Sequence, residues 1–243
     1  MSIPIQAPLL SGQHPAHVPG ERRRQDLYPT PPALCRAILR ALLDLELLFD
    51  GATVIEPHVG RGDWVSALDQ VAVERNHRYR VTVHDLDPTV PGLDLRPKHL
   101  VVVRSLPSGD WLQRAQQRAD QGRTWDLAVG NPPFANPVPG KVRGEVVAHH
   151  HVNATRSVAR YTAMVLRDGL WTSSTDEERM AWALNERPRY RFDLAPRPSF
   201  TGDNRRGQFG SVAAVWGPHP PHIWTMSRVL DWRREGALAD ELA

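Results

Sequence analysis

The chain has 243 residues, of which 41% are hydrophobic and 23% are charged. This composition is typical of a folded globular domain and falls short of the low-complexity range. The 30 Lys and Arg residues nearly balance the 27 Asp and Glu residues, so the net charge of +3 permits nucleic-acid binding without requiring it.

The cysteine content and the length of the apolar segments indicate the cellular compartment of the protein. One cysteine excludes an intramolecular disulfide and favours a reducing compartment. No apolar run approaches the ~18 residues that a membrane span needs, and the first residues lack the basic segment of a signal peptide. We therefore expect a cytoplasmic protein with no membrane partner.

Three regions are expected along the chain. Residues 1–27 contain four prolines and three consecutive arginines, which predicts an irregular arm, either a surface tail or a segment that contacts phosphates. Residues 28–217 are expected to form the main domain. Residues 218–243 are expected to form a tail that ends in a short helix after His222.

Helices and strands alternate through the main domain. Leucine and isoleucine recur at helical spacing after Pro31 and Pro32, and predict a first helix that ends at Gly51. Further helices are expected over residues 64–73, 110–121, 146–158 and 176–185. Strands are expected over residues 53–56, 79–84, 100–104, 125–129, 161–166, 190–194 and 211–216. This alternation predicts an α/β fold with a seven-stranded, mainly parallel sheet, in which ligands bind beyond the carboxyl ends of the strands.

The first strand leads into a glycine-rich turn, residues 56–63, which reads Glu-Pro-His-Val-Gly-Arg-Gly-Asp. The turn lacks the third glycine of a dinucleotide fingerprint and the Lys-Ser/Thr of a phosphate loop. The carboxylates of Glu56 and Asp63 repel a pyrophosphate but attract an ammonium or sulfonium group. S-adenosylmethionine (SAM) carries both of these cations and no phosphate. The alternative is a turn with a purely structural role.

Acidic residues also follow the second and third strands. Asp85 lies 23 residues beyond Gly62, near the spacing at which a carboxylate accepts both hydroxyl protons of a ribose. Asp110 is suited to accept a hydrogen bond from an adenine amine, and Trp111 to cover the adenine ring. The alternatives are capping aspartates and a tryptophan of the core.

The fourth strand is followed by Asn131-Pro132-Pro133-Phe134, the most specific signal in the chain. Two prolines stiffen this turn and remove two N–H donors. The side-chain oxygen of Asn131 and the carbonyl of Pro132 can then accept the two hydrogens of one planar amine. Phe134 offers a stacking face to the ring that carries the amine. The alternative is a rigid turn with a buried phenylalanine.

In this order the motifs resemble the SAM-dependent amino-methyltransferases, in particular the adenine-N6 DNA methyltransferases with the gamma-type order of motifs. Residues 28–31, Tyr-Pro-Thr-Pro, resemble the Tyr-x-Thr-Pro element of that family, and residues 197–217 are loosely similar to small phage or prophage enzymes. The resemblance implies a Rossmann-like SAM-methyltransferase fold with helices on both faces of the sheet. It implies that SAM is bound by Tyr28, Thr30, Pro31, Glu56, Pro57, His58, Gly60, Gly62, Asp63, Asp85, Leu86, Asp110, Trp111 and Asn131.

The resemblance further implies that Asn131, Pro132, Pro133 and Phe134 direct methyl transfer to adenine N6 in DNA, with the base flipped out of the helix. Basic residues suited to contact DNA, or else to form solvated surface, are Lys141, Arg143, Arg205 and Arg206. No large target-recognition region is evident, so the DNA sequence that is recognised is either short or read by loops and a second subunit, such as a homodimer partner. No metal is expected, because three consecutive histidines, residues 149–151, cannot all face one ion.

Two other functions remain open from sequence. The Asn-Pro-Pro-Phe motif suits any planar amine, so the acceptor could instead be an RNA base or a protein glutamine. A subunit that binds SAM or nucleic acid without turnover is the other alternative, although the intact motif argues against it. Cytosine-C5 methylation is disfavoured, because Cys35 lies in the first predicted helix rather than after the fourth strand.

Overall fold

The computed structural model describes residues 29–84, 100–105, 111–122, 124–136, 145–172, 177–200, 210–218 and 225–237. The predicted N-terminal arm, residues 1–27, lies outside these ranges. The helices are α1 (Pro32–Asp44), α2 (Asp63–Arg75), α3 (Trp111–Asp120), α4 (Ala148–Arg156), α5 (Gly169–Thr172), α6 (Glu177–Asn185) and α7 (Trp232–Glu235). The strands are β1 (Thr53–Glu56), β2 (Arg80–Val83), β3 (Val101–Ser105), β4 (Trp125–Gly130), β5 (Ala135–Asn136), β6 (Glu145–Val146), β7 (Ala159–Arg167), β8 (Tyr190–Ala195), β9 (Ser211–Trp216) and β10 (Met226–Asp231).

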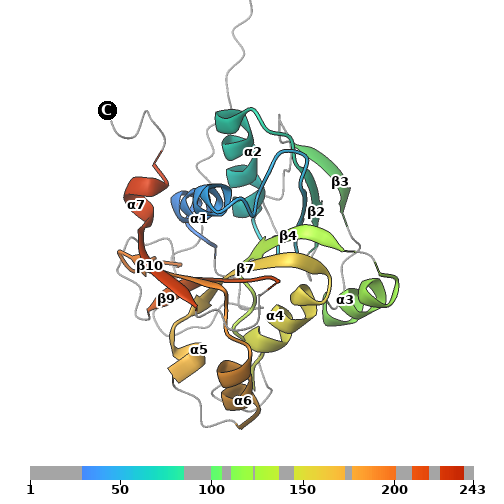
Figure 1. Cartoon of the computed structure of the whole chain (residues 1–243), viewed down its shortest axis with the longest axis vertical. Coiled ribbons are helices and arrows are strands. Elements are labelled where there is room, and N and C mark those ends of the chain that lie inside the picture. The colour runs from blue at the N-terminus through green and yellow to red at the C-terminus, as the bar shows by residue number, and fades with distance from the viewer. Residues whose placement is uncertain are drawn as a thin grey trace, which may run out of the picture.

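The main sheet has the strand order β10-β8-β9-β7-β4-β1-β2-β3 (Figure 1). Strand β9 runs antiparallel to both of its neighbours, and every other pairing in this sheet is parallel. The seven predicted strands are all present and form the order β8-β9-β7-β4-β1-β2-β3. The predicted α/β fold with a mainly parallel sheet is therefore confirmed.

An eighth strand, β10, joins the edge of this sheet beside β8, where the sequence pattern predicted only a helical tail. That prediction was wrong for residues 226–231, and within the described residues, which end at 237, they are followed by the four-residue helix α7. Leu230 is the one buried residue of the strand, while Met226 and Val229 are exposed. Backbone pairing with β8 holds the strand in place. Because this pairing does not depend on the side chains, the sequence of the strand shows no alternation of apolar and polar residues from which a strand could be predicted.

The first helix also ends earlier than expected, at Asp44 rather than at Gly51. Glu46 adopts a left-handed backbone conformation with φ of 58°, which stops the helix. Leu47 and Leu48 are nevertheless buried, and both of their N–H groups donate to the carbonyl of Leu42. The leucine spacing therefore correctly identified buried residues, but it continued past the point where the helix ends.

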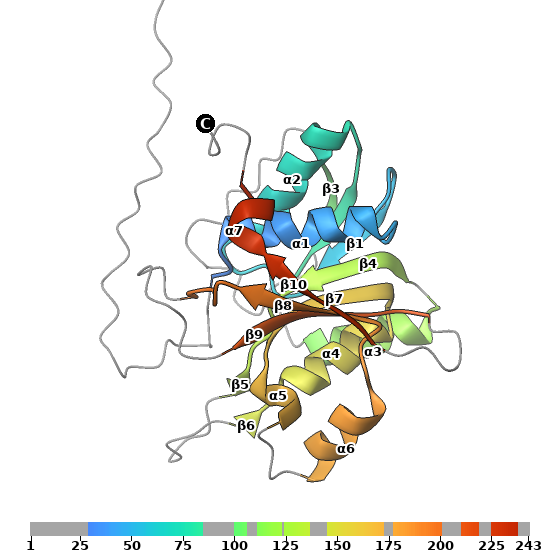
Figure 2. The same cartoon turned by 60° about the vertical axis from the view of Figure 1, so that its left-hand side comes forward.

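Helices cover both faces of the sheet, as predicted (Figure 2). Helices α1, α2 and α7 pack on one face, where Leu34, Ile38 and Leu68 belong to one apolar cluster. Helices α3 to α6 pack on the other face, where Trp111, Val152 and Trp182 belong to a second cluster. Burying apolar area on both faces is what holds a parallel sheet of this kind together.

The C-terminal helix is held by two arginines of α1. The buried Arg36 donates from Nε to the carbonyl of Gly236 at 2.6 Å. Arg40 donates to the carbonyls of Glu235 and Ala237. Backbone carbonyls at the end of a short helix thus find charged donors, and the last described residues become part of the domain.

Within the described part of the chain, no helix has the length and apolar character needed to cross a membrane.

Candidate active site

The predicted site residues that the structure describes converge at the carboxyl ends of β1, β2 and β4. Residue Glu56 is the last of β1 and pairs with Val83, the last of β2. Strand β4 ends at Gly130, where a side-chain carbon would lie 3.7 Å from Pro57 and from His58. The topology therefore brings the glycine-rich turn against the start of the Asn-Pro-Pro-Phe motif, although these two segments are far apart in the sequence.

The glycine-rich turn is a fixed backbone structure. Gly60 and Gly62 have φ of 48° and 80°, a left-handed conformation that only glycine adopts at little cost. The N–H of Gly62 donates to the carbonyl of Val59 at 2.7 Å, and the N–H of Val59 donates to the carbonyl of His84 at 2.9 Å. The turn is thus tied to the end of β2, and helix α2 starts at its last residue.

Two carboxylates lie at the ends of this turn, beside the start of α1. Glu56 is only 1% exposed, and Thr30, which precedes α1, is 4% exposed. The backbone N–H of Thr30 donates a hydrogen bond to the carboxylate of Asp63. Asp63 and Glu56 both raise the pKa of the Cys35 thiol, after burial, which is the largest cause. The predicted cofactor residues Thr30, Glu56 and Asp63 therefore share one acidic, largely enclosed place.

Burial raises the pKa of Asp63, and Arg61 and the Thr30 N–H offset this only in part. When folding raises the pKa of a carboxyl group, the protonated form favours the folded state. The contribution of that group to the free energy of unfolding is complete below the ordinary pKa of 3.8 and is lost as the pH rises through the folded-state pKa. The ionised Asp63 therefore costs stability at neutral pH. Such a cost is expected where a carboxylate is kept for a ligand rather than for the fold.

Replacing Asp63 by asparagine is accordingly expected to stabilise the protein at pH 7. Asparagine retains an oxygen for the Thr30 N–H and removes the buried charge, so we expect the Tm to rise by about 2–4 °C if about 1 kcal/mol is regained. The gain should shrink as the pH is lowered through the raised folded-state pKa of Asp63 to its ordinary value of 3.8, because the carboxyl group is protonated there. Thermal unfolding at both pH values measures it, with the exposed Asp44→Asn as control. A lower Tm at pH 7 would show that Asp63 supports the fold.

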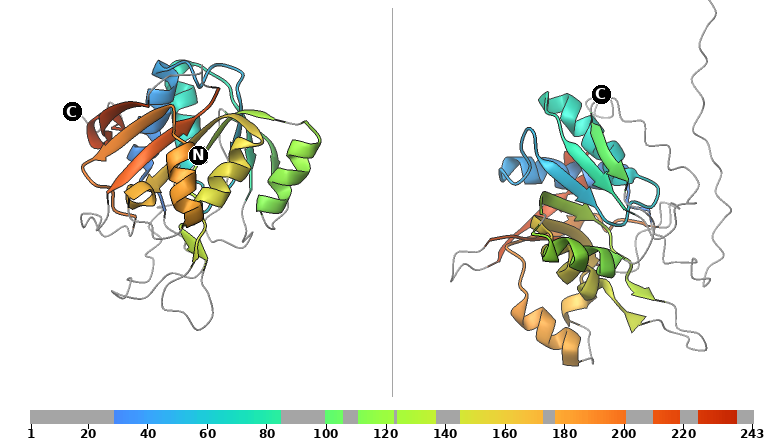
Figure 3. Two further views of the ribbon diagram at one scale, coloured as in Figure 1. Left: turned by 60° about the horizontal axis from the view of Figure 1, so that its bottom comes forward. Right: turned by 90° about the vertical axis from the view of Figure 1, so that its right-hand side faces the viewer.

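The Asn-Pro-Pro-Phe motif leaves the sheet at β4 and leads into a small separate ribbon. Asn131 and Pro133 are half-buried, while Pro132 is buried. The carbonyl of Phe134 accepts a hydrogen bond from the N–H of Val147, just before α4, at 3.2 Å. Strands β5 and β6 then pair antiparallel and project from the body of the domain (Figure 3). The motif is thus anchored at both ends.

Phe134 itself is packed in the core rather than exposed. Its side chain is 8% exposed and belongs to the cluster beneath α3 and α4. The guanidinium carbon of Arg167, the last residue of β7, lies 4.6 Å from the centre of the ring. A cation over one face of an aromatic ring is an attractive contact. Phe134 is therefore packed as the alternative of a buried phenylalanine predicts, and Arg167 already contacts one face of its ring.

Trp111 is likewise a core residue in this structure, at 2% exposure. Its Nε1 donates to the hydroxyl of Thr155 at 3.0 Å. Its ring packs against His84 and His58, with centroids 5.3 and 6.5 Å away. Trp111 is therefore packed as the core-tryptophan alternative predicts, and its ring contacts His58 and His84, which follow β1 and β2.

A histidine pair behind the turn was not predicted from the sequence. Nε2 of His58 and Nδ1 of His151 lie 2.8 Å apart, which joins the glycine-rich turn to α4. Burial lowers the pKa of His58, and the neighbouring His151 and His84 lower it further, so His58 is neutral at pH 7. The pair spans 93 residues of sequence, and no local pattern could have indicated it.

Pro31 directly precedes α1, and its carbonyl accepts a hydrogen bond from the N–H of Cys35. Several other predicted site residues are not placed by the structure. The predicted residues outside the described ranges are Tyr28, Asp85, Leu86, Asp110, Lys141, Arg143, Arg205 and Arg206.

Comparison with known proteins shows a likeness of fold but not of sequence. No protein-family model and no curated protein sequence matches the chain. A chain from Listeria monocytogenes, proposed to be a class I SAM-dependent methyltransferase, aligns with a TM-score of 0.59 at 10% identity, over 86% of this chain and 67% of that one.

Two further structures come from type I restriction–modification systems. The methyltransferase subunit from Streptococcus thermophilus aligns with a TM-score of 0.61 at 12% identity, over 85% of this chain and 48% of that one. A chain from a study of complex assembly in such a system aligns with a TM-score of 0.59 at 15% identity, over 86% and 46%. The present chain thus spans about half the length of these two, and it has the Rossmann-like methyltransferase fold.

Proposed function

We propose that this chain binds SAM and transfers its methyl group to the N6 amine of adenine in DNA. One observation carries the proposal: the Asn-Pro-Pro-Phe motif begins directly beside the glycine-rich turn and its carboxylates, at the carboxyl edge of the sheet. Ligands of such sheets bind at this edge. The fold neighbours described as methyltransferases, one of them as SAM-dependent, agree with this proposal.

The residues of the turn fit SAM by charge and by space. The carboxylates of Glu56 and Asp63 suit the ammonium and sulfonium groups of that molecule, and neither would suit a phosphate. Gly60 and Gly62 present backbone without side chains, so a ligand can approach closely. Asp85 and Asp110 are proposed to bind the ribose and the adenine of the cofactor. When bound, SAM supplies an electrophilic methyl group.

The residues of the motif are proposed to act on the acceptor. An exocyclic amine conjugated with its ring is a weak nucleophile. The side-chain oxygen of Asn131 and the carbonyl of Pro132 accept its two hydrogens, which localises the lone pair on nitrogen. This nitrogen would gain the methyl group as the methyl–sulfur bond breaks, the electron pair of that bond would stay on sulfur to leave the thioether S-adenosylhomocysteine, and the methylated amine would release one proton to water. Catalysis of this kind depends on positioning and electrostatics, without a strong base.

DNA is the acceptor that the fold neighbours favour, because two of them belong to restriction–modification systems. An adenine in duplex DNA must leave the base stack to reach the motif. Lys141, Arg143, Arg205 and Arg206 are proposed to contact the phosphates, where each contact would add to the salt dependence of binding. A second subunit, either another copy or a different chain, is proposed to supply target specificity.

The proposal is tested with SAM labelled in its methyl group and the full-length chain. Unmethylated duplex DNA, single-stranded DNA, RNA and a glutamine peptide are offered in parallel, and labelled nucleosides are identified after digestion. A matched duplex, made with N6-methyladenine in place of adenine, is the control. We expect label as N6-methyladenine in the ordinary DNA and none in the matched duplex.

The other outcomes each contradict a defined part of the proposal. Label that persists in the matched duplex would assign the acceptor to the N4 amine of cytosine. Label in RNA or peptide alone would replace DNA as the acceptor. Absence of label in all substrates, with SAM binding retained in calorimetry, would make the chain a non-catalytic subunit. Absence of SAM binding would overturn the proposal that SAM is the cofactor.

A further inference from the structure

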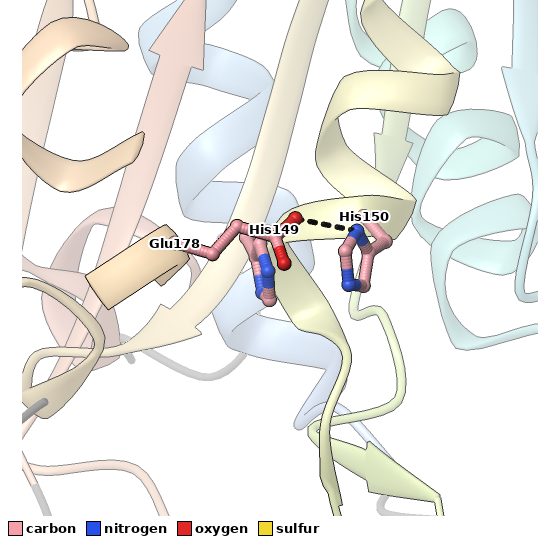
Figure 4. A group of neighbouring side chains, drawn as sticks. All are labelled: His149, His150 and Glu178. Carbon is pink, nitrogen blue, oxygen red and sulfur yellow. Dashed lines mark ion pairs between the residues drawn. The ribbon is translucent and has the colours of Figure 1, made fainter. Parts of the chain in front are cut away.

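Two adjacent histidines and a glutamate meet on the face of the sheet that α3 to α6 cover. His149 and His150 lie in the first turn of α4, and Glu178 lies in the first turn of α6 (Figure 4). One potential ligand atom from each of the three side chains lies within 4.8 Å of the other two. His149 is buried, whereas the side chain of Glu178 is 73% exposed and can reorient.

The arrangement answers the objection that three consecutive histidines cannot share one ion. His151 points elsewhere and contacts His58 at 2.8 Å. The rings of His149 and His150 instead lie side by side, with centroids 3.9 Å apart and planes 35° apart. Glu178 approaches from a different helix, with 3.9 Å between its Oε1 and Nδ1 of His150. The third ligand therefore comes from the tertiary structure.

Two imidazole nitrogens and one carboxylate oxygen form a donor set typical of Zn²⁺ and similar divalent transition metals. Zn–N distances of about 2.0–2.1 Å place tetrahedral ligand atoms about 3.3 Å from one another. The three ligand atoms lie within 4.8 Å of one another, and the Glu178 and His150 pair is 3.9 Å apart, so the site closes by shifts of about 1.5 Å or less, which rotation of the exposed Glu178 and half-buried His150 side chains can supply. Water would complete the coordination.

One physical effect opposes binding. The amino ends of α4 and α6 meet at this point, and the partial positive charge of a helix amino end disfavours a cation. The charge of Glu178 and the direct bonds from two imidazoles outweigh this cost. The two histidines must be neutral to bind the ion, so affinity falls as the pH is lowered.

We propose that His149, His150 and Glu178 bind a divalent transition metal ion of the Zn²⁺ type. The ion joins the start of α6 to the start of α4. These helices are also linked by the hydrogen bond from Trp182 Nε1 to Asn153 Oδ1 at 2.8 Å, and Arg156 of α4 forms an ion pair with Glu186, the residue that follows α6. Its role is to hold α6 against the sheet. This site is separate from the proposed methyl-transfer chemistry, and its test does not depend on that function.

The test is Zn²⁺ titration of the full chain, after chelator treatment, by calorimetry. We expect one equivalent to bind, and affinity to fall at least about tenfold in His150→Ala and in Glu178→Gln, because loss even of a group that only supports a metal ligand lowers affinity by about 10–100-fold. Neither side chain is buried, so neither change should unfold the protein. Glu177→Gln, the adjacent exposed carboxylate of α6, is the matched control and should bind like the wild type.

Two spectroscopic readouts locate the ion. Co²⁺ should give the visible absorption of a tetrahedral nitrogen–oxygen site in the wild type and in Glu177→Gln, and lose it in the two site variants. Ni²⁺ should quench tryptophan fluorescence, because the ring of Trp182 lies 6.0 Å from that of His149. Absence of binding would overturn the proposal, because no metal site would then exist. Binding that is equally strong in all variants would also overturn it, because the ion would then bind at other residues.

Discussion

Replacing Asn131 by alanine is expected to lower kcat for methyl transfer by about 10²–10³-fold, while the Tm remains close to that of the wild type. The expected loss is comparable to that of deleting one preorganised hydrogen-bonding group from an active site. Asn131 is half-buried, directly follows β4 and precedes two prolines that hold its backbone. Its removal leaves the carbonyl of Pro132 as the single acceptor for the amine.

Two further variants make this result interpretable. Asn131→Asp keeps an acceptor oxygen in the same place and is expected to retain more activity than the alanine variant. Asn185→Ala changes an exposed residue at the end of α6 and should leave the rate unchanged. Single-turnover assays with labelled SAM measure the rates. An alanine variant within about tenfold of the wild type would remove Asn131 from the proposed mechanism.

The second large effect is expected on stability, from Gly236→Ala. A side-chain carbon at Gly236 would lie 1.8 Å from the carbonyl oxygen of Ala33 and 2.6 Å from that of Trp232. Both contacts are to backbone, which cannot rotate away. Relief requires α7 to move off α1, and that breaks the hydrogen bond from the buried Arg36 to the Gly236 carbonyl. We expect a loss of about 3 kcal/mol or more.

Such a loss corresponds to a fall in Tm of about 6–12 °C for a domain of this size, measured by circular dichroism on heating. Gly122→Ala is the matched control, because it tests backbone conformation without a clash. Gly122 has φ of 62°, and a side-chain carbon there would have no neighbouring atom within 4 Å, so about 1 kcal/mol is expected from strain alone. Gly236 has φ of −93°, which alanine adopts freely. Equal effects of the two changes would contradict the close packing of α7.

The Asp63→Asn variant connects stability with the proposed function. The same charge that costs stability at neutral pH is the one proposed to attract the cationic groups of SAM. A variant that is more stable yet binds SAM more weakly would show that Asp63 is retained for the ligand. A variant that is unchanged in SAM affinity would place the charge recognition on Glu56, which is the more deeply buried of the two.

The strands and turns of the main sheet could be predicted because their signals are local. Val101–Val103 is a run of β-branched residues and Trp125–Val129 is largely apolar, and both patterns predict strands from local sequence alone. Gly60 and Gly62 mark a turn because left-handed backbone is costly for other residues. By contrast, β10 has one buried residue and joins β8 through backbone hydrogen bonds, which most sequences can make.

The candidate site divides in the same way. The sequence by itself determined which residue types follow each strand, and therefore which chemical groups reach the carboxyl edge of the sheet. It did not determine which of them are enclosed: Phe134 and Trp111 pack in the core, with Arg167 and Thr155 as partners from distant segments.

Only the tertiary structure decided the contacts between residues far apart in the chain. The pairing of His58 with His151, and the approach of Glu178 to His149 and His150, both depend on where α4 and α6 settle against the sheet. That position minimises exposed apolar area over the whole domain and is not encoded in any one segment. Local sequence therefore placed the reactive groups along the chain, and the packing of the helices decided which of them meet.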